Sequence, residues 1–158
     1  MTNEEVGRAL IARGETITSA ESLTAGMFVS ALAGVSGISA VLPGAFVTYA
    51  AAAKTQLVGV PADMIATYGV VSAEVAKAMA TGAKATLQTA WGISFTGVAG
   101  PDALEGHPAG TVFIGVAAPD GSVVATEHHF TGDRQAVREA SVAAGFAAIA
   151  IKLAELAK

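Results

Sequence analysis

The chain has 158 residues, of which 53% are hydrophobic and 14% are charged. This composition excludes an intrinsically disordered protein, and the length predicts one compact domain over residues 1–158. A formal net charge of −4, with nine scattered Lys and Arg residues, argues against a nucleic-acid-binding protein.

No cysteine is present, which excludes disulfide and thiolate chemistry. The N-terminal residues 1–5 are polar and acidic, and the longest apolar run, 142–151, is far shorter than the roughly 20 residues of a membrane span. We therefore expect a cytoplasmic protein without membrane or nucleic-acid partners. The apolar content also predicts a homodimer, because exposed apolar surface often marks an interface.

Helices and strands alternate along the sequence. Helices are predicted from a cap at Thr2 or Asn3 to Gly14, over 24–33, over 50–58, over 62–68, from Ser72 to about Leu87, and from a cap at Asp133 nearly to Lys158, with a further helical turn at 38–42. Strands are predicted over 15–19, 45–49, 91–96, 111–118 and 123–130. The last two strands are joined by Pro-Asp-Gly-Ser, which is typical of a hairpin turn.

This order predicts an α/β fold, a three-layer α/β/α sandwich on a mixed, mostly parallel five-stranded sheet with one antiparallel strand. Ligands of such sheets bind beyond the carboxyl ends of the parallel strands. The segments that follow Ser19, Tyr49 and Thr96 are therefore the first places to search for a site.

The first of these segments reads Ala-Glu-Ser-Leu-Thr-Ala-Gly-Met, with Ser22 where a strand passes into a helix. Backbone N–H groups at a helix N-terminus attract an anion, and the small residues Ala25 and Gly26 would let a phosphate approach. The alternative is that Ser22 or Thr24 only caps the helix. The local sequence by itself favours the cap.

The second segment, Phe-Val-Thr-Tyr-Ala-Ala-Ala-Ala-Lys, places Lys54 about one helical turn after Tyr49. A desolvated lysine beside a serine can act as its base, as in Ser-Lys hydrolases. The alternative is a solvated lysine on an alanine-rich helix and a tyrosine packed at a strand end.

The third segment begins Thr-Gly-Val-Ala-Gly-Pro at Thr96. Two glycines and a proline directly after a strand predict a tight loop whose N–H groups can face an anion or an oxyanion. A purely structural turn is equally compatible with this sequence. Neither a dinucleotide-binding glycine motif nor a Walker A motif occurs in the chain.

A fourth segment, Phe-Thr-Gly-Asp-Arg-Gln-Ala-Val-Arg, places Arg134 and Arg138 on one face at the start of the last helix. Cations are disfavoured at an unliganded helix N-terminus, so the pair suggests an anionic ligand. Two solvated arginines, or an Arg138–Asp133 contact, are the alternative. A metal site is not predicted, because adjacent His128 and His129 point to opposite faces of a strand.

These segments, in this order, resemble the CinA C-terminal domain family, which includes the stand-alone nicotinamide-nucleotide amidases. The resemblance runs from about Val6 to Ala148 through TSAESLTAG, GAFVTYAAAAK, LVGV, YGVVSAEVAKAMATGA, TGVAGPD with HPAGTV, and FTGDRQAVR. It implies a three-layer α/β/α fold. It also implies hydrolysis of the carboxamide of nicotinamide mononucleotide to nicotinate mononucleotide and ammonia, without a metal or organic cofactor.

The resemblance also implies roles for individual residues. Ser22 matches the nucleophile, and Lys54 with Tyr49 matches the polar pair that moves its proton. Substrate contacts are expected from the following residues: Thr24, Ala25, Gly26, Thr96, Gly97, Ala99, Gly100, Arg138 and, as the weaker candidate, Arg134.

The chain departs from the family pattern at several positions. The family usually reads Glu-Ser-Cys-Thr-Gly-Gly where this chain has Leu23 and Ala25, and Tyr-Ser-Asn where it has Tyr49 followed by two alanines. Ala25 and Ala51 favour the alternative of a non-catalytic nucleotide- or phosphate-binding regulatory module. A partner-binding protein linked to competence or DNA damage is a third hypothesis.

Overall fold

The computed structural model describes residues 2–158, and its strands form a single five-stranded sheet in the order β2–β1–β3–β4–β5. The strands are β1 (Ile17–Glu21), β2 (Phe46–Val47), β3 (Trp91–Gly97), β4 (Thr111–Ala117) and β5 (Val123–His129). β1 pairs in parallel with β2 and β3, whereas β4 is antiparallel to both β3 and β5. The prediction of a mixed sheet with one antiparallel strand is therefore confirmed.

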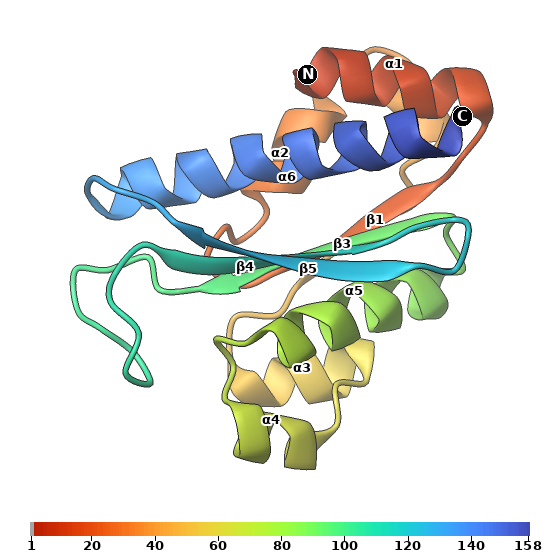
Figure 1. The fold of residues 1–158 in the computed structure, drawn as a ribbon. Coiled ribbons are helices and arrows are strands. Elements are labelled where there is room, and N and C mark those ends of the chain that lie inside the picture. Colours follow the sequence, from red (N-terminus) through yellow and green to blue (C-terminus); the bar gives the residue numbers. More distant parts are fainter. Residues whose placement is uncertain (1) are drawn as a thin grey trace.

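Helices cover both faces of this sheet and complete the three predicted layers (Figure 1). One face carries α1 (Asn3–Arg13), α2 (Met27–Ala33) and α6 (Arg134–Leu156). The other carries α5 (Ala73–Leu87), with α3 (Ala51–Val58) and α4 (Ala62–Tyr68) packed beside it. A short 3₁₀ helix, η1 (Ile38–Ala40), follows α2.

The helix boundaries follow local capping chemistry. Thr2 and Glu5 form a capping box at the start of α1, and Gly14 ends that helix in the left-handed conformation at φ 65°. Asp133 caps α6 by accepting from the backbone N–H of Ala136 at 2.8 Å. Within residues 2–158, no helix has the length and the apolar character that a membrane crossing requires.

Aromatic rings join α2, α6 and the sheet at the centre of the core. The ring centroid of Phe28 lies 5.3 Å from that of Phe95 on β3 and 4.5 Å from that of Phe146 on α6. Gly145 makes this close approach possible, because a Cβ there would lie only 2.5 Å from the Phe95 ring. The hydrophobic core thereby fixes α2 and α6 relative to the carboxyl end of β3.

Two boundaries differ from the predictions in a way that matters for the site. The first strand begins at Ile17 and ends at Glu21, two residues later than predicted. The next helix begins at Met27 and not at residue 24 as predicted, so residues 22–26 form a non-helical turn. All five residues of β1 are buried, although Thr18, Ser19 and Glu21 are polar, so the polarity of the residues does not show where the strand ends.

Candidate active site

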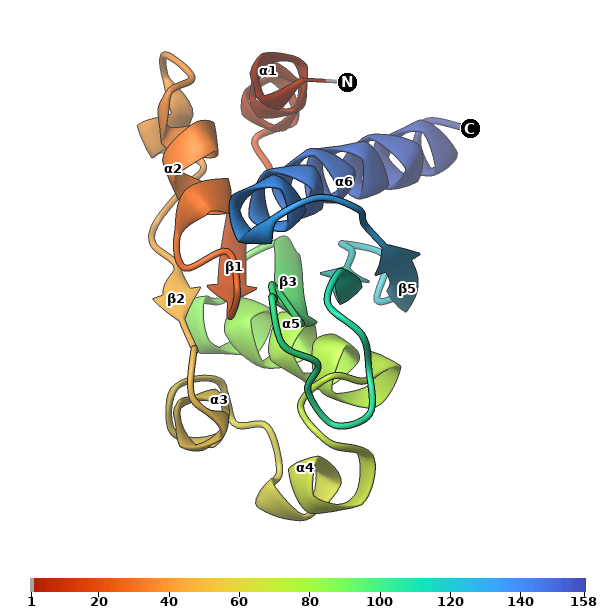
Figure 2. The same cartoon turned by 90° about the vertical axis from the view of Figure 1, so that its left-hand side faces the viewer.

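A cleft lies at the carboxyl ends of β1, β2 and β3, which end side by side with the loop after β3 next to them (Figure 2). The cleft encloses about 900 Å³ of empty space, its open mouth included. The turn after β1, the segment after β2, the loop after β3 and the start of α6 all contribute to it. Its lining residues are Ser22, Leu23, Tyr49, Val70, Thr96, Gly97, Val98, Ala99, Gly100, Pro101, Asp102, Ala103, Leu104 and Arg134.

Ser22 lines the cleft and contacts Lys54, which lies behind it. The Lys54 ammonium Nζ donates to Ser22 Oγ at 3.0 Å and to the carbonyl oxygens of Thr48 at 2.7 Å and Tyr49 at 3.2 Å. The Ser22 hydroxyl donates to the Tyr49 carbonyl at 3.3 Å. A primary amine is thus held in direct contact with a hydroxyl at the edge of the cleft.

Lys54 is buried although it carries an ionisable group, with only 1% of its surface exposed. Burial lowers the pKa of Lys54 to about 8, and the charge of Glu105 opposes this shift in part. The neutral amine is therefore accessible near neutral pH. This property distinguishes Lys54 from a surface lysine, whose proton would stay in place until about pH 10.

Glu21 precedes Ser22, and its side chain is completely buried. Its carboxylate accepts hydrogen bonds from the backbone N–H groups of Gly26, Phe28 and Val29 at 3.2, 2.9 and 3.1 Å. It also accepts from the hydroxyls of Ser19 and Thr24 at 2.9 and 2.8 Å. The anion at the N-terminus of α2 is therefore a side chain of the protein itself.

This arrangement bears on the expectation that Thr24, Ala25 and Gly26 offer N–H groups to a substrate phosphate. The Gly26 N–H is bound to Glu21, and the Ala25 N–H donates to the Ser22 carbonyl at 3.1 Å. None of the three residues is among those that line the cleft. The structure does not bring them to the cleft, because the turn is folded around the Glu21 carboxylate.

The loop after β3 contributes backbone to the opposite wall. Thr96, Gly97, Ala99 and Gly100 all line the cleft, and the Thr96 hydroxyl donates to the Val70 carbonyl at 2.7 Å. Among residues 2–158, the backbone N–H groups of Ala99, Gly100 and Leu23 have no hydrogen-bond acceptor. Backbone donors on residues around a nucleophile are the means by which acyl-transfer sites stabilise an oxyanion.

The two arginines of the α6 N-terminus have different surroundings. Arg134 lines the cleft, and its guanidinium donates to the Gly100 carbonyl at 2.6 Å and to the Tyr49 hydroxyl at 2.7 Å. Arg138 does not line it and instead donates to the Leu23 carbonyl at 2.8 Å and to Gln135 at 2.9 Å. Arg134 is therefore the arginine of the pair that lines the cleft, whereas Arg138 binds the turn that carries Ser22.

A second carboxylate fixes the loop after β3. Glu105 accepts from the backbone N–H groups of Val70 and Val71 at 3.0 and 2.9 Å. These bonds join the loop to the connection between α4 and α5. Gly69 leaves room for the contact, since a Cβ there would lie 2.6 Å from the carboxylate. Neither Glu105 nor Glu21 was assigned a role from the sequence.

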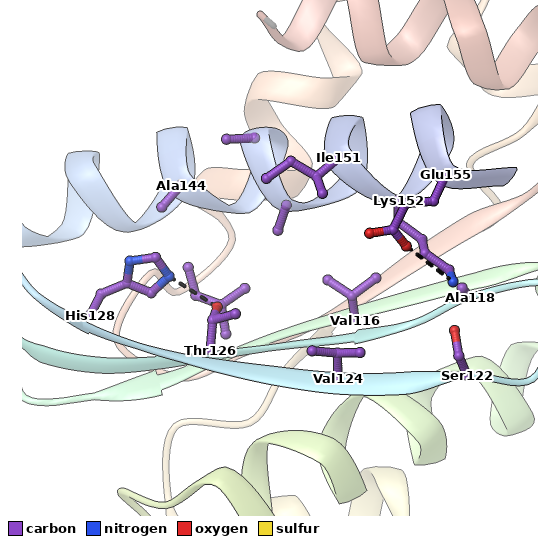
Figure 3. Close-up of a pocket in the computed structure, with 13 residues that line it drawn as sticks. Val116, Ala118, Ser122, Val124, Thr126, His128, Ala144, Ile151, Lys152 and Glu155 are labelled. Carbon is purple, nitrogen blue, oxygen red and sulfur yellow. Dashed lines mark hydrogen bonds and ion pairs between the residues drawn. The ribbon is translucent and has the colours of Figure 1, made fainter. Parts of the chain in front are cut away.

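Another hollow lies between α6 and the β4–β5 hairpin and shares no lining residue with the cleft (Figure 3). Alkyl groups such as Val116, Val124 and Ile151 line it. Its polar groups have partners: Thr126 pairs with His128 at 3.0 Å, and Lys152 forms ion pairs with Asp120 at 2.8 Å and Glu155 at 3.5 Å. It contains no counterpart of the contact between a hydroxyl and a buried amine, so we place the candidate chemistry in the cleft.

The fold and the cleft define an α/β protein with a buried serine–lysine pair at the carboxyl ends of its parallel strands. The family model of the CinA C-terminal domain matches residues 1–153. The chain therefore belongs to the CinA C-terminal domain family.

Relatives and solved structures agree with this assignment. The chain is 60% identical over 136 residues to a protein of Lactiplantibacillus plantarum named as competence-damage inducible, a match that covers 86% of this chain and 32% of that protein. It thus spans about a third of the length of the curated relatives it matches.

Among solved structures, a CinA superfamily protein of Klebsiella pneumoniae superposes with a TM-score of 0.93 at 35% identity, covering 97% of this chain and 96% of that one. A CinA superfamily protein of Escherichia coli gives 0.88 at 33% identity, with 92% and 87% covered.

Proposed function

We propose that this chain is an amidohydrolase that converts nicotinamide mononucleotide and water into nicotinate mononucleotide and ammonia. The observation that carries the proposal is the 3.0 Å contact between Lys54 Nζ and Ser22 Oγ at the edge of the cleft. A binding module has no need of an amine with a lowered pKa against a hydroxyl. A hydrolase that uses a serine nucleophile needs an adjacent base to take the hydroxyl proton, and Lys54 is placed to do so.

The carbonyl groups around Lys54 favour its role as the general base. A neutral amine has two N–H bonds and one lone pair. The carbonyls of Thr48 and Tyr49 accept hydrogen bonds from both N–H groups, so the lone pair is free to accept the proton of the Ser22 hydroxyl. Lys54 thus takes the proton of Ser22 as Oγ bonds to the amide carbon.

The resulting oxyanion is stabilised by backbone N–H groups from Leu23, Ala99 and Gly100. When this intermediate collapses, the C–N bond breaks and Lys54 returns its proton to the leaving nitrogen, which departs as ammonia. Water then attacks the Ser22 ester and gives its proton to Lys54. The ester bond breaks, Ser22 is reprotonated, and the carboxylate product is released.

The remaining lining residues suit the rest of the substrate. Among the cleft residues of the described chain, Arg134 is the one with a positive charge, so it binds the 5′-phosphate. Tyr49 is 53% exposed, and its ring offers a face to the cationic pyridinium. The Asp102 carboxylate at the same cleft also favours a cationic ring.

Ammonia release from nicotinamide mononucleotide tests the proposal, with Ser22→Ala measured beside the parent protein. We expect release by the parent and a loss of at least about a hundredfold in the variant. A folded parent that binds the nucleotide, shown by calorimetry, but releases no ammonia would instead be a binding module.

A further inference from the structure

Glu21 connects the nucleophile to the fold through a side chain that takes no part in the proposed chemistry. The Glu21 carboxylate accepts five hydrogen bonds and donates none. Three of these donors are backbone N–H groups on both sides of the start of α2. A single buried carboxylate therefore ties the end of β1 to the first turn of α2.

The turn between these elements, residues 22–26, carries Ser22 and has an uncommon backbone. Ala25 and Gly26 both adopt positive φ values, 44° and 95°. Outside the Glu21 carboxylate, the turn is bound at its start by the Ser22 N–H to the Phe95 carbonyl and by Arg138 to the Leu23 carbonyl. Farther along, the Ala25 N–H binds the Ser22 carbonyl, and the Met27 N–H binds the Thr24 carbonyl. A turn of this kind persists only where its surroundings fix it, and the Glu21 carboxylate is the group around which it folds.

The backbone of Glu21 is linked to Lys54 through Thr48. Its carbonyl accepts from the Thr48 N–H at 2.8 Å, and the Thr48 carbonyl accepts from Lys54 Nζ at 2.7 Å. A substitution of the Glu21 side chain leaves this backbone connection in place. It therefore perturbs the Ser22 side of the contact and spares the Lys54 side.

We infer that Glu21 is a positioning residue of this site: its buried carboxylate holds the turn that sets Ser22 Oγ against Lys54 Nζ. The inference rests on the proposed function, in which that contact activates the nucleophile. Because the Glu21 carboxylate occupies the N-terminus of α2, the 5′-phosphate of the substrate binds at Arg134 instead.

Glu21→Gln is the sharpest test, because it keeps the volume of the side chain. The new amide has a donor NH₂ group where the carboxylate accepted from donors only, so part of the set is left unpaired. We expect kcat to fall ten- to about a hundredfold, as displacements of about 1 Å do elsewhere. KM for nicotinamide mononucleotide should stay within about twofold, since Arg134 and Thr96 lie on other elements.

A second readout reports on Ser22 without the nucleotide. Phenylmethanesulfonyl fluoride labels an activated serine: the Oγ–S bond forms, the S–F bond breaks, fluoride leaves, and the base takes the hydroxyl proton. Labelling followed by mass spectrometry should slow in Glu21→Gln by a factor similar to that of kcat, with Ser22→Ala as the blank. The matched control is Thr2→Ala, which removes the capping box of α1 far from the cleft and should lower stability without slowing the labelling.

A folded Glu21→Gln protein that keeps the parental kcat and labelling rate overturns the inference. If that variant does not fold, Ser19→Ala replaces it, since it removes one of the five donors. We then expect labelling to slow about two- to fivefold, and the parental rate overturns the inference. The proposed function fails separately: a parent whose Ser22 is labelled but which releases no ammonia refutes the substrate, while the labelling comparison still decides the role of Glu21.

Discussion

Lys54 Nζ lies 3.0 Å from Ser22 Oγ, although the two residues are 32 positions apart in the chain. The contact is buried, and the carbonyls of Thr48 and Tyr49 hold the amine from the other side. The same nitrogen donates to Ser22 when protonated and can accept from it when neutral. In the proposed reaction, the protonation state of Lys54 therefore decides whether Ser22 is activated as a nucleophile.

The first prediction concerns the pH dependence of the reaction. Since Lys54 must be neutral to accept the Ser22 proton, kcat/KM should rise about tenfold per pH unit in acid and level off above the pKa of Lys54, about 8. Initial rates of ammonia release across this range measure it. Lys54→Arg is the control, because its guanidinium stays protonated and should lower kcat/KM at least about a hundredfold. A flat profile through this range would exclude Lys54 as the base.

The second prediction concerns stability. Burial lowers the pKa of Lys54 to about 8 in the folded protein, whereas the unfolded chain keeps the ordinary value of 10.5. Between these two pH values the unfolded state holds a proton that the folded state has lost. The free energy of unfolding therefore rises with pH in that window, by about 3 kcal/mol in total.

Urea denaturation of the parent and of Lys54→Met measures this effect. The difference between the two proteins isolates Lys54, because all other groups titrate in both. We expect the free energy of unfolding of the parent to increase relative to that of the variant as the pH rises from 8 to 10.5. A difference that does not change with pH would mean that the lysine has an ordinary pKa in the folded state.

Much of the fold follows from the sequence, because caps and turn residues mark most boundaries. The helix predicted over 62–68 is α4 (Ala62–Tyr68), and the hairpin at Pro-Asp-Gly-Ser joins β4 and β5 as predicted. Two strands are exceptions: β2 covers only Phe46–Val47 of the predicted 45–49, and β1 begins and ends two residues later than predicted. All residues of β1 are buried, although Thr18, Ser19 and Glu21 are polar, so polar residues do not show where the strand ends. Glu21 resembles a residue that ends a strand, but it lies inside both the strand and the core.

The site was predictable where it depends on strand ends, since the loops that follow parallel strands meet at one edge. The roles of Glu21 and Glu105 depend instead on long-range folding of loops onto backbone N–H groups. Burial of a carboxylate becomes apparent only when those donors are in place. Glu21 is the single charged residue in the sequence run 17–28, and this was the feature of the sequence that could have indicated a special role for it.

The third prediction separates the two arginines. If Arg134 binds the 5′-phosphate, Arg134→Ala should lower kcat/KM for nicotinamide mononucleotide at least about tenfold more than for the corresponding riboside, which lacks a phosphate. The lost contact with the Gly100 carbonyl acts on both substrates alike and cancels in this comparison. Arg138→Ala should act on both substrates alike, because Arg138 holds the Leu23 carbonyl next to Ser22. Equal losses on both substrates in Arg134→Ala would place the phosphate elsewhere.

The fourth prediction concerns Ala25, which has φ 44° in the turn after Ser22. A left-handed conformation costs an L-residue roughly 1–2 kcal/mol, and the exposed methyl group gains no packing in return. Ala25→Gly should therefore stabilise the protein by about 1 kcal/mol and raise Tm by about 2–4 °C.

Thermal unfolding measures this change, with Ala143→Gly as the matched control. Ala143 is also exposed but lies inside α6, where glycine costs about 1 kcal/mol relative to alanine, so the two substitutions should shift Tm in opposite directions. Activity should be preserved in Ala25→Gly, because Glu21 still fixes the turn through Thr24 and α2. A destabilised Ala25→Gly would show that the alanine restricts the unfolded chain by more than its strained backbone costs in the native turn.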